Sequence, residues 1–369
     1  MTRHPRRRIA LVFGGRSAEH EISVVSAKSV LRALDPERYD VLTIGIDKEG
    51  RWHRLDALPA GSTPQALPAV EDAAGRSVGL SRDPGDAALV DEEGGREPID
   101  VVFPLLHGPF GEDGTIQGML DLAGVPYVGA GVLGSAVGMD KAVQKVLFRD
   151  AGLAVVPFEV VLEPVWDRDR DGVHARAQRL GYPMFVKPAA LGSSVGITKV
   201  KEPEQLDSAM PLAFEYGRKA LMERAMEGAR EIEIAVLGND DPETSVAGEI
   251  VPSHEFYDYE AKYLDENGAA LLIPADLDDA TQKQLQEMAV AAFRAAEAAG
   301  MARVDFFLMA DGAAYVNEIN TIPGFTKISM YPRLWEASGL SYTALVDRLI
   351  ELAVERHQLE RKRGRSFPG

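Results

Sequence analysis

The stretch that most constrains this chain runs from residue 302 to residue 324 and reads ARVDFFLMADGAAYVNEINTIPG. Two apolar-rich runs, VDFFLM and AYVNEI, flank an Asp311-Gly312 pair. An Asp-Gly pair between such runs is a strong hairpin signal, because both turn positions tolerate positive φ. The stretch therefore predicts a β-hairpin, with a loop of two residues, or a symmetric four, centred on this pair.

The predicted hairpin brings four polar side chains to one end of one sheet face. In its register, Arg303 faces Asn320 and Asp305 faces Glu318. Side chains alternate along a strand, so all four project in the same direction. Carboxylate and amide oxygens suit Mg²⁺, which takes one or two protein carboxylates and keeps several waters. On this stretch alone, the alternative is an exposed hairpin end whose acids are solvated or paired with Arg303.

The first part of the chain predicts a parallel α/β unit. Residues 7–15 form a strand pattern, residues 19–34 a helix pattern and residues 39–47 a second strand pattern. The run IDVVFPLLHG is continuously apolar, as a strand buried on both faces should be, and it is followed by HGPFGEDGTIQG, a helix containing MLDLAG and a strand at PYVG. Residues 48–98 have little periodicity, so we expect a peripheral excursion with one short strand at RWHRL.

The remainder alternates strands and helices. Between residues 155 and 222 we predict strands at VVPFEVVL, PMFVKPAA and VGITKV, helices near 175–180 and 204–216, and a glycine loop at LGSS. Strands at LMERAM and EIEIAVLGN follow, and the tyrosine-rich segment SHEFYDYEAKYLDENG is interpreted as a lid. Helices are predicted at about 280–299 and 342–357. These patterns predict an α/β (α+β) fold.

Composition excludes several classes of function. The length of 369 residues predicts two or three domains. A net charge of −17 argues against nonspecific nucleic-acid binding, so no nucleic-acid partner is expected. The sequence has neither a signal-peptide pattern nor an apolar run of the ~18 residues that a membrane span needs, which predicts no membrane partner and a cytoplasmic location. With no cysteine, disulfides, thiol nucleophiles and thiolate metal sites are excluded.

The motif GAGVLG at residues 129–134 lies between a predicted strand and a helix predicted at MDKAVQKVLFRDAG, and it has the spacing of a dinucleotide-binding fingerprint. Such a site needs a second strand that ends in an acid about 20 residues further on, and Glu163 comes too late. A turn that links two domains is the favoured interpretation. An NAD-binding oxidoreductase is retained as an alternative, and dinucleotide binding without ATP binding would support it.

Seven motifs in order resemble the D-alanine:D-alanine ligase family of ATP-grasp enzymes over nearly the whole chain. They are GGRSAEHEIS, HGPFGEDGTIQG, MDK, VKPAALGSSVG, EAKY, RVDFF and NEINTIPGFT. The resemblance implies a three-domain ATP-grasp architecture, which we divide into an N-terminal parallel α/β substrate domain (1–134), a central ATP-grasp domain (135–222) and a C-terminal catalytic domain (223–369). It also implies a homodimer, and small-molecule substrates in the form of D-alanine and ATP.

The same resemblance implies the chemistry. ATP phosphorylates the carboxylate of one D-alanine, the amine of a second attacks the acyl phosphate, and phosphate leaves from a tetrahedral intermediate. Two Mg²⁺ or Mn²⁺ ions would bridge the ATP phosphates. Their ligands would be Asp305, Glu318 and Asn320, and Arg303 would steady the oxyanion. A structural ion pair between Arg303 and Asp305 is the alternative role, and both can hold at once.

The other site residues follow from their positions in the motifs. The resemblance assigns to the nucleotide Lys141, Lys187, Ser193, Ser194, Glu223, Arg224, Met226, Glu231 and Lys262. It assigns to the first D-alanine Glu19, His107 and Glu112, and to the second Gly324, Ser329 and Met330. Glu19, Ser193 and Tyr263 would form a hydrogen-bonded set that joins the three domains on closure and helps to move the proton of the amine.

Three further alternatives concern activity. A related group forms D-alanyl-D-lactate, and in some of its members the lid tyrosine is lost or replaced by phenylalanine, so Tyr263 within an intact EAKY favours an amine nucleophile. An ATP-grasp ligase for another amino acid is separable only by assay. A noncatalytic nucleotide-binding relative would be expected to lack some metal ligands or Arg303, and this sequence contains them. The sequence therefore predicts a D-alanine:D-alanine ligase that supplies peptidoglycan precursor.

Overall fold

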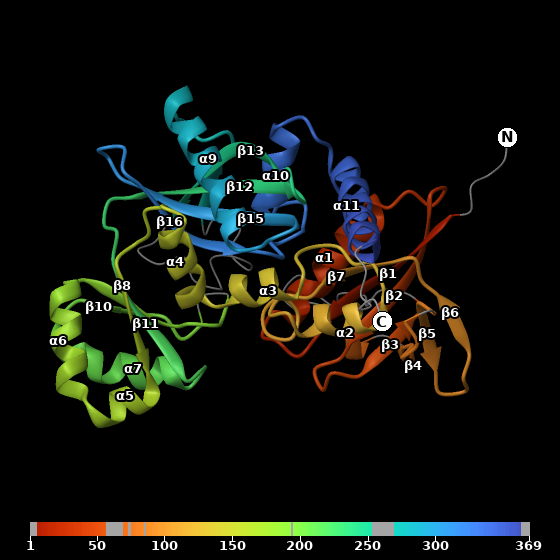
Figure 1. Ribbon diagram of the computed structural model, residues 1–369, viewed down its shortest axis with the longest axis horizontal. Helices are drawn as coiled ribbons and strands as arrows, with labels where there is room; N and C mark the ends of the chain where they lie inside the picture. Colours follow the sequence, from red (N-terminus) through yellow and green to blue (C-terminus); the bar gives the residue numbers. More distant parts are fainter. Residues whose placement is uncertain are drawn as a thin grey trace, which may run out of the picture.

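The computed structural model describes residues 6–56, 69–72, 75–84, 86–192, 195–252 and 269–362. Within these residues the chain builds three β-sheets, of seven, four and five strands. The seven-stranded sheet lies at one end of the molecule and the four-stranded sheet at the other, with the five-stranded sheet and its helices between and above them (Figure 1). No helix in the described ranges has the length and hydrophobicity that crossing a membrane requires. The three sheets and the helices beside them confirm the predicted α/β (α+β) class.

The seven-stranded sheet has the order β6-β5-β4-β3-β2-β1-β7. Its strands are β1 (Arg7–Gly14), β2 (Tyr39–Ile46), β3 (Trp52–Leu55), β4 (Gly75–Leu80), β5 (Ala88–Asp91), β6 (Arg96–Pro98) and β7 (Val101–Leu105). β1 pairs in parallel with β2 and with β7, as predicted, whereas β3 to β6 are added antiparallel. The predicted excursion therefore contributes four strands to this sheet, of which only β3 was expected.

Alternate side chains of β1 bury the two faces of this sheet. Ile9, Leu11 and Phe13 pack in one cluster with α1 (His20–Ala33), and Ala10 and Val12 pack in another with α2 (Thr115–Ala123). The short 3₁₀ helix Val70–Asp72 lies in the excursion. PYVG was predicted as a strand, but it forms only a single bridge, between Tyr127 and Val102. The predicted strand is therefore absent apart from this bridge.

The helix expected at residues 139–152 is present, and a second helix that was not expected comes directly before it. They are α3 (Val132–Met139) and α4 (Lys141–Asp150). The chain turns at Asp140, whose carboxylate accepts hydrogen bonds from the N–H groups of Ala142 and Val143 and so caps α4. The last glycine of the GAGVLG motif serves packing: a Cβ at Gly134 would lie 2.3 Å from the carbonyl oxygen of Glu297. This contact favours the linking turn over a dinucleotide site.

The four-stranded sheet has the order β10-β9-β11-β8 and is antiparallel throughout. Its strands are β8 (Phe158–Leu162), β9 (Met184–Pro188), β10 (Thr198–Val200) and β11 (Lys219–Arg224). Its helices are α5 (Glu163–Arg168), which was not predicted, α6 (Arg170–Leu180), the 3₁₀ helix Pro203–Gln205 and α7 (Leu206–Phe214). β11 runs across residue 222, where the predicted central domain ends.

The five-stranded sheet has the order β14-β13-β12-β15-β16. Its strands are β12 (Arg230–Gly238), β13 (Glu243–Pro252), β14 (Ala269–Leu272), β15 (Gly300–Leu308) and β16 (Ala314–Asn320). Its helices are α9 (Asp279–Ala295), α10 (Met330–Ala337) and α11 (Tyr342–Lys362). β13, β14 and α10 were not predicted. The segment interpreted as a lid, SHEFYDYEAKYLDENG, lies outside the described residues.

The hairpin of β15 and β16 confirms the predicted pairing at the site end but not the predicted loop. Arg303 faces Asn320 and Asp305 faces Glu318. Gly312 has φ +85° and its N–H donates to the carbonyl of Met309, which closes a three-residue loop rather than a symmetric one. A loop with an odd number of residues shifts the strand pairing by one residue relative to the predicted register. A β-bulge between the turn and the site shifts the pairing back.

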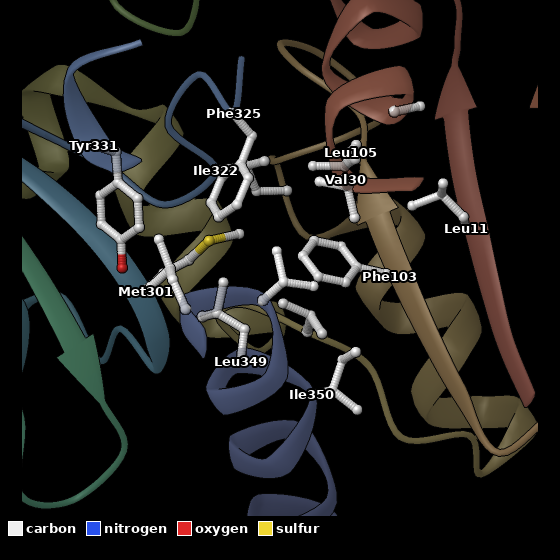
Figure 2. Close-up of a cluster of buried hydrophobic side chains, with 14 of the residues drawn as sticks. Leu11, Val30, Phe103, Leu105, Met301, Ile322, Phe325, Tyr331, Leu349 and Ile350 are labelled. Carbon is white, nitrogen blue, oxygen red and sulfur yellow. The ribbon is translucent and has the colours of Figure 1, made fainter. Parts of the chain in front are cut away.

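A shared hydrophobic core docks the N-terminal sheet onto the C-terminal part of the chain (Figure 2). The Phe103 ring of β7 meets the Phe325 ring edge-on, with centroids 6.1 Å apart, and Phe325 also contacts Tyr331 and Tyr342. The Tyr342 hydroxyl donates to the carbonyl of Phe325 at 2.6 Å. Leu349 and Ile350 bring α11 into the same cluster. This docking fixes the loops after β1 and β7 above the C-terminal sheet.

Candidate active site

The predicted site residues line one cleft with a volume of about 1020 Å³ where the three sheets meet. Those with a place on its wall are Glu19, His107, Glu112, Lys141, Lys187, Glu223, Met226, Glu231, Arg303, Asp305, Glu318, Asn320, Gly324, Ser329 and Met330. Arg224 does not line the cleft, and its side chain is exposed. Ser193, Ser194, Lys262 and Tyr263 lie outside the described residues. The sequence therefore identified residues from distant segments that the fold brings together.

Asp305 stands at the centre of the hairpin end. The guanidinium of Arg303 donates to both its carboxylate oxygens at 2.7 Å, and the Asn320 amide donates at 3.0 Å. Arg303 also lies 3.0 Å from Glu233 of β12. Although burial alone would lower the pKa of Arg303, the charges of Asp305 and Glu233 raise it well above its usual range. The guanidinium thus stays charged, and the ion pair weighed as an alternative role for Arg303 is present.

Lys141 begins α4 and reaches the other acid of the hairpin end. Its ammonium lies 3.0 Å from a carboxylate oxygen of Glu318 and donates at 2.9 Å to the carbonyl of Leu191. Burial would lower the pKa of Lys141, but the charge of the Glu318 carboxylate and its hydrogen bond to the ammonium outweigh burial and raise the pKa. A solvated lysine is therefore excluded at this position.

Glu223 joins two buried ammonium groups. Lys187 of β9 donates to one of its carboxylate oxygens at 2.6 Å, and Lys145 of α4 lies 2.7 Å from the other. Burial raises the pKa of Glu223, but the two lysines lower it further and keep the group ionised. Lys145 was missed by the sequence analysis. Its signal was the spacing of four residues from Lys141, which puts both side chains on one face of a helix.

Two of the residues assigned to the nucleotide, Glu223 and Arg224, end β11, and Met226 lies just beyond it. The Arg224 N–H donates to the carbonyl of Pro157, and the N–H of Ala225 donates to the carbonyl of Pro183. Ala225 and Met226 line the cleft, and Glu231 on β12 lines it from the neighbouring sheet. The end of one sheet and the start of another thus form an apolar slot with acids at its edges. Recognition of a base there would depend on backbone groups more than on Arg224.

The wall formed by the N-terminal domain is rich in buried titratable groups. His107 donates from Nδ1 to the carbonyl of Ile322 at 3.1 Å, and burial lowers its pKa. The Glu112 carboxylate accepts the N–H of Gly108 at 2.8 Å. Burial, together with the charge of Glu19, raises the pKa of Glu112 to about 8. His107 is therefore neutral, and Glu112 remains mostly protonated at neutral pH.

Glu19 comes from the start of α1 and is 8% exposed. A Cβ at Gly108 would lie 3.0 Å from its carboxylate, and a Cβ at Gly192 would lie 3.2 Å from it. These glycines bring the loop after β7 and the glycine loop after β9 against one carboxylate. An anion held between two loops of different domains suits a small cationic group such as an α-ammonium.

The loop between β16 and α10 supplies the last part of the wall. Ser329 Oγ accepts the N–H of Thr326 at 3.1 Å and lies 2.8 Å from the Thr326 hydroxyl. A Cβ at Gly324 would lie 3.0 Å from Ser329 Oγ, so this position has no room for a side chain. Met330 is buried and lines the cleft from the start of α10. Hydroxyl donors beside a bare backbone can hold a carboxylate.

The hairpin end fits a divalent cation that keeps other ligands. Among the described residues, no group of three histidines, aspartates or glutamates is arranged to hold a metal without help. Asp305, Glu318 and Asn320 instead offer two carboxylates and one amide oxygen on a single cleft wall. This donor set suits Mg²⁺, whose shell is completed by waters and substrate phosphates.

Two family models match the chain: "D-ala D-ala ligase N-terminus" over residues 8–130 and "D-ala D-ala ligase C-terminus" over residues 147–351. The chain is 50% identical over 358 residues to a D-alanine--D-alanine ligase of Thermoanaerobacter sp. (strain X514), covering 95% of this chain and 98% of that protein. It is 48% identical over 357 residues to D-alanine--D-alanine ligase A of Salmonella typhimurium, covering 95% and 96%.

Solved structures agree with these matches. The D-alanine-D-alanine ligase from Coxiella burnetii superposes with a TM-score of 0.85 and 40% identity, covering 97% of each chain. The VanG D-Ala:D-Ser ligase from Enterococcus faecalis superposes with a TM-score of 0.83 and 36% identity, covering 94% of this chain and 99% of that one. The ATP-grasp fold predicted from the motifs is confirmed by this similarity.

Proposed function

Because the chain belongs to the D-alanine–D-alanine ligase family, we propose that it joins two D-alanines at the expense of ATP and so supplies a precursor of peptidoglycan. The family implies the use of ATP and of a divalent metal. The observation that carries the proposal is the convergence of Lys141, Lys187, Asp305, Glu318 and Arg303 on one cleft, where every charge has a partner of opposite sign within 3.0 Å.

In the first step, the carboxylate of one D-alanine attacks the γ-phosphorus of ATP, and ADP leaves. Lys141 and Lys187 would hold the phosphates, together with the glycine loop that contains Ser193 and Ser194, and with Lys262. Glu223, Arg224, Met226 and Glu231 would hold the nucleoside. Asp305, Glu318 and Asn320 would ligate two Mg²⁺ ions, which neutralise phosphate charge when bound. Manganese is expected to replace magnesium, because the donor set is composed of oxygens.

In the second step, the amine of another D-alanine attacks the acyl phosphate, loses a proton, and the carbon–oxygen bond to phosphate breaks. Arg303 lies beside Asp305 on the cleft wall, where its fixed charge can stabilise the tetrahedral oxyanion. Glu19 would bind the ammonium of the first D-alanine, within a wall shaped by His107 and Glu112. Ser329 would bind the carboxylate of the second, next to Gly324 and Met330. Ser193 and Tyr263 would join Glu19 in moving the proton of the amine.

The decisive experiment measures phosphate release from ATP with purified protein, Mg²⁺ and a panel of acceptors, with mass spectrometry of the product. D-alanine alone should give ADP, phosphate and D-alanyl-D-alanine in equal amounts. The panel includes D-lactate and D-serine, because the solved relative that names D-serine is 36% identical to this chain. Turnover only with another acceptor would replace the substrate assignment, and NAD binding without ATP binding would refute the ligase.

Three further features belong to the proposal. We expect a cytoplasmic protein that divides into domains at residues 134 and 222. We also expect a homodimer, because neighbouring helices α2 and α3 expose large apolar side chains, namely Met119, Leu122, Val132 and Leu133. Light scattering during gel filtration tests the dimer, and Leu122→Lys with Leu133→Lys should yield a monomer.

A further inference from the structure

The edge strand β16 contains an irregularity on which the geometry of the hairpin end depends. Next to the loop, Phe306 faces Val316, whereas at the site Asp305 faces Glu318, so Asn317 is an extra residue in β16. Without this bulge the loop register would place Asn317 opposite Asp305, and Glu318 would turn to the other face of the sheet. The bulge is therefore what brings both carboxylates to the cleft.

Helix α4 holds all three residues of the bulge region from outside the sheet. The Lys145 ammonium donates to the carbonyl of Asn317 at 2.7 Å, and the Gln144 side-chain oxygen accepts the N–H of Ile319 at 2.8 Å. Lys141 contacts the intervening Glu318. Gln144 and Lys145 lie three and four residues after Lys141, so all three side chains share one helix face. A bulge otherwise leaves backbone groups without partners, and here side chains supply them.

Lys145 also connects this bulge to the other sheet. Its ammonium is fully buried and lies 2.7 Å from Glu223 of β11, whose other oxygen accepts from Lys187 of β9. A buried ammonium is costly unless it is fully paired. One side chain thus ties the strand that bears Glu318 to the strand that bears Lys187, and a shift of either sheet would break its contacts.

We propose that Lys145 and Gln144 are positioning residues that hold the β16 bulge in the register that presents Glu318 beside Asp305 to a divalent cation and its nucleotide. Neither side chain is assigned to the nucleotide or the metal. This inference rests on the proposed nucleotide and metal role of the cleft. Residues that fix the ligands of a metal typically change metal affinity about 10- to 100-fold when they are replaced.

The test compares Lys145→Met and Gln144→Leu in the full-length protein. Mn²⁺ binding is measured by electron paramagnetic resonance in the presence of a nonhydrolysable ATP analogue, without D-alanine. In both variants, the affinity for Mn²⁺ should fall by about 10-fold or more. Gln144→Leu removes only neutral hydrogen bonds, so it remains informative if Lys145→Met folds poorly. Hydrogen exchange in the metal-free protein should be faster at the amide of Ile319 in both variants.

Trp166→Leu is the control, because Trp166 is buried in the core of the four-stranded sheet, in a hydrophobic cluster that contains neither a residue of the bulge nor a metal ligand. It should lower thermal stability while leaving Mn²⁺ affinity and exchange at Ile319 unchanged. If the variants lose stability like this control but keep wild-type Mn²⁺ affinity, the positioning role is refuted and the proposed function stands. If the wild-type protein binds no Mn²⁺ with the nucleotide analogue, the proposed function fails, and this inference fails with it.

Discussion

The raised pKa of Glu112 makes a quantitative prediction about stability. An unfolded chain would ionise this carboxyl near its ordinary pKa of 4.5, whereas burial and the charge of Glu19 raise the folded-state pKa to about 8. Between these two values the folded protein keeps a proton that the unfolded chain has lost. The free energy of unfolding therefore falls as pH rises from 4.5 to about 8 and does not fall further above it.

The magnitude follows from the size of the rise in pKa, because each unit corresponds to about 1.4 kcal/mol. The contribution of Glu112 should decrease by roughly 5 kcal/mol across this window. Glu112→Gln removes the titration but keeps an oxygen that can accept the N–H of Gly108. The variant should therefore gain stability relative to the wild type as pH rises, with most of the gain reached by pH 8.

Urea unfolding of both proteins at intervals from pH 5 to pH 9 provides the measurement. Glu93→Gln is a suitable control, because Glu93 is exposed in the turn between β5 and β6, at the opposite edge of the sheet from β7, and its replacement should leave the pH profile parallel to that of the wild type. Parallel profiles for Glu112→Gln and the wild type would refute the reasoning. Such a result would mean that Glu112 is ionised in the folded protein, with solvent or a cation beside it.

Three other predictions test the site. Asp305→Asn combined with Glu318→Gln should abolish phosphate release without altering the circular dichroism spectrum, and retained activity would contradict the metal assignment. Phe325→Ala should lower the free energy of unfolding by about 3–5 kcal/mol and raise the KM for D-alanine, because it loosens the N-terminal domain; an unchanged KM would disprove that coupling. Tyr263→Phe should raise D-alanyl-D-lactate over dipeptide when both acceptors compete, and an unchanged ratio would count against its role with the amine proton.

The hairpin at the site was predictable because its signals are local. The Asp311-Gly312 pair and the alternating strands predict the facing residues without knowledge of the rest of the chain. The loop has three residues where an even number was predicted, and the bulge restores the predicted pairing at the site. The bulge leaves a mark in the sequence: the core residues Val316 and Ile319 are three apart, where a regular strand would place them two or four apart.

Strands β4 and β6 could not be predicted from hydrophobic pattern. Their side chains are mostly exposed or half-buried, so no apolar alternation marks them. They are strands because main-chain groups pair with a neighbour that is already in the sheet, which is a tertiary cause. Helix α4 had local signals, because Asp140 is a favoured cap before it, whereas α3 was not predicted, since its first residues belong to the glycine motif that was interpreted as a turn.

The buried charges of the cleft were identified as a set, but their partners were not. The sequence assigned both Lys187 and Glu223 to the nucleotide, but it did not predict that their side chains bond to each other, and it omitted Lys145. Both omissions have one cause. Contacts between α4, β11 and β16 depend on how two sheets meet, and neither periodicity nor motif spacing carries that information.

These ion pairs also explain how an acidic protein can build a cleft for a polyanion. Lys141 is paired with Glu318, Arg303 with Asp305, and Lys187 with Glu223, so each of these three cations has a carboxylate beside it. Under the proposed function, the phosphates of ATP would become the partners of the two lysines, while a divalent cation would take Asp305 and Glu318 as ligands. Asp305 and Glu318, which hold Arg303 and Lys141 in place in this structure, would then be the carboxylates that ligate the metal.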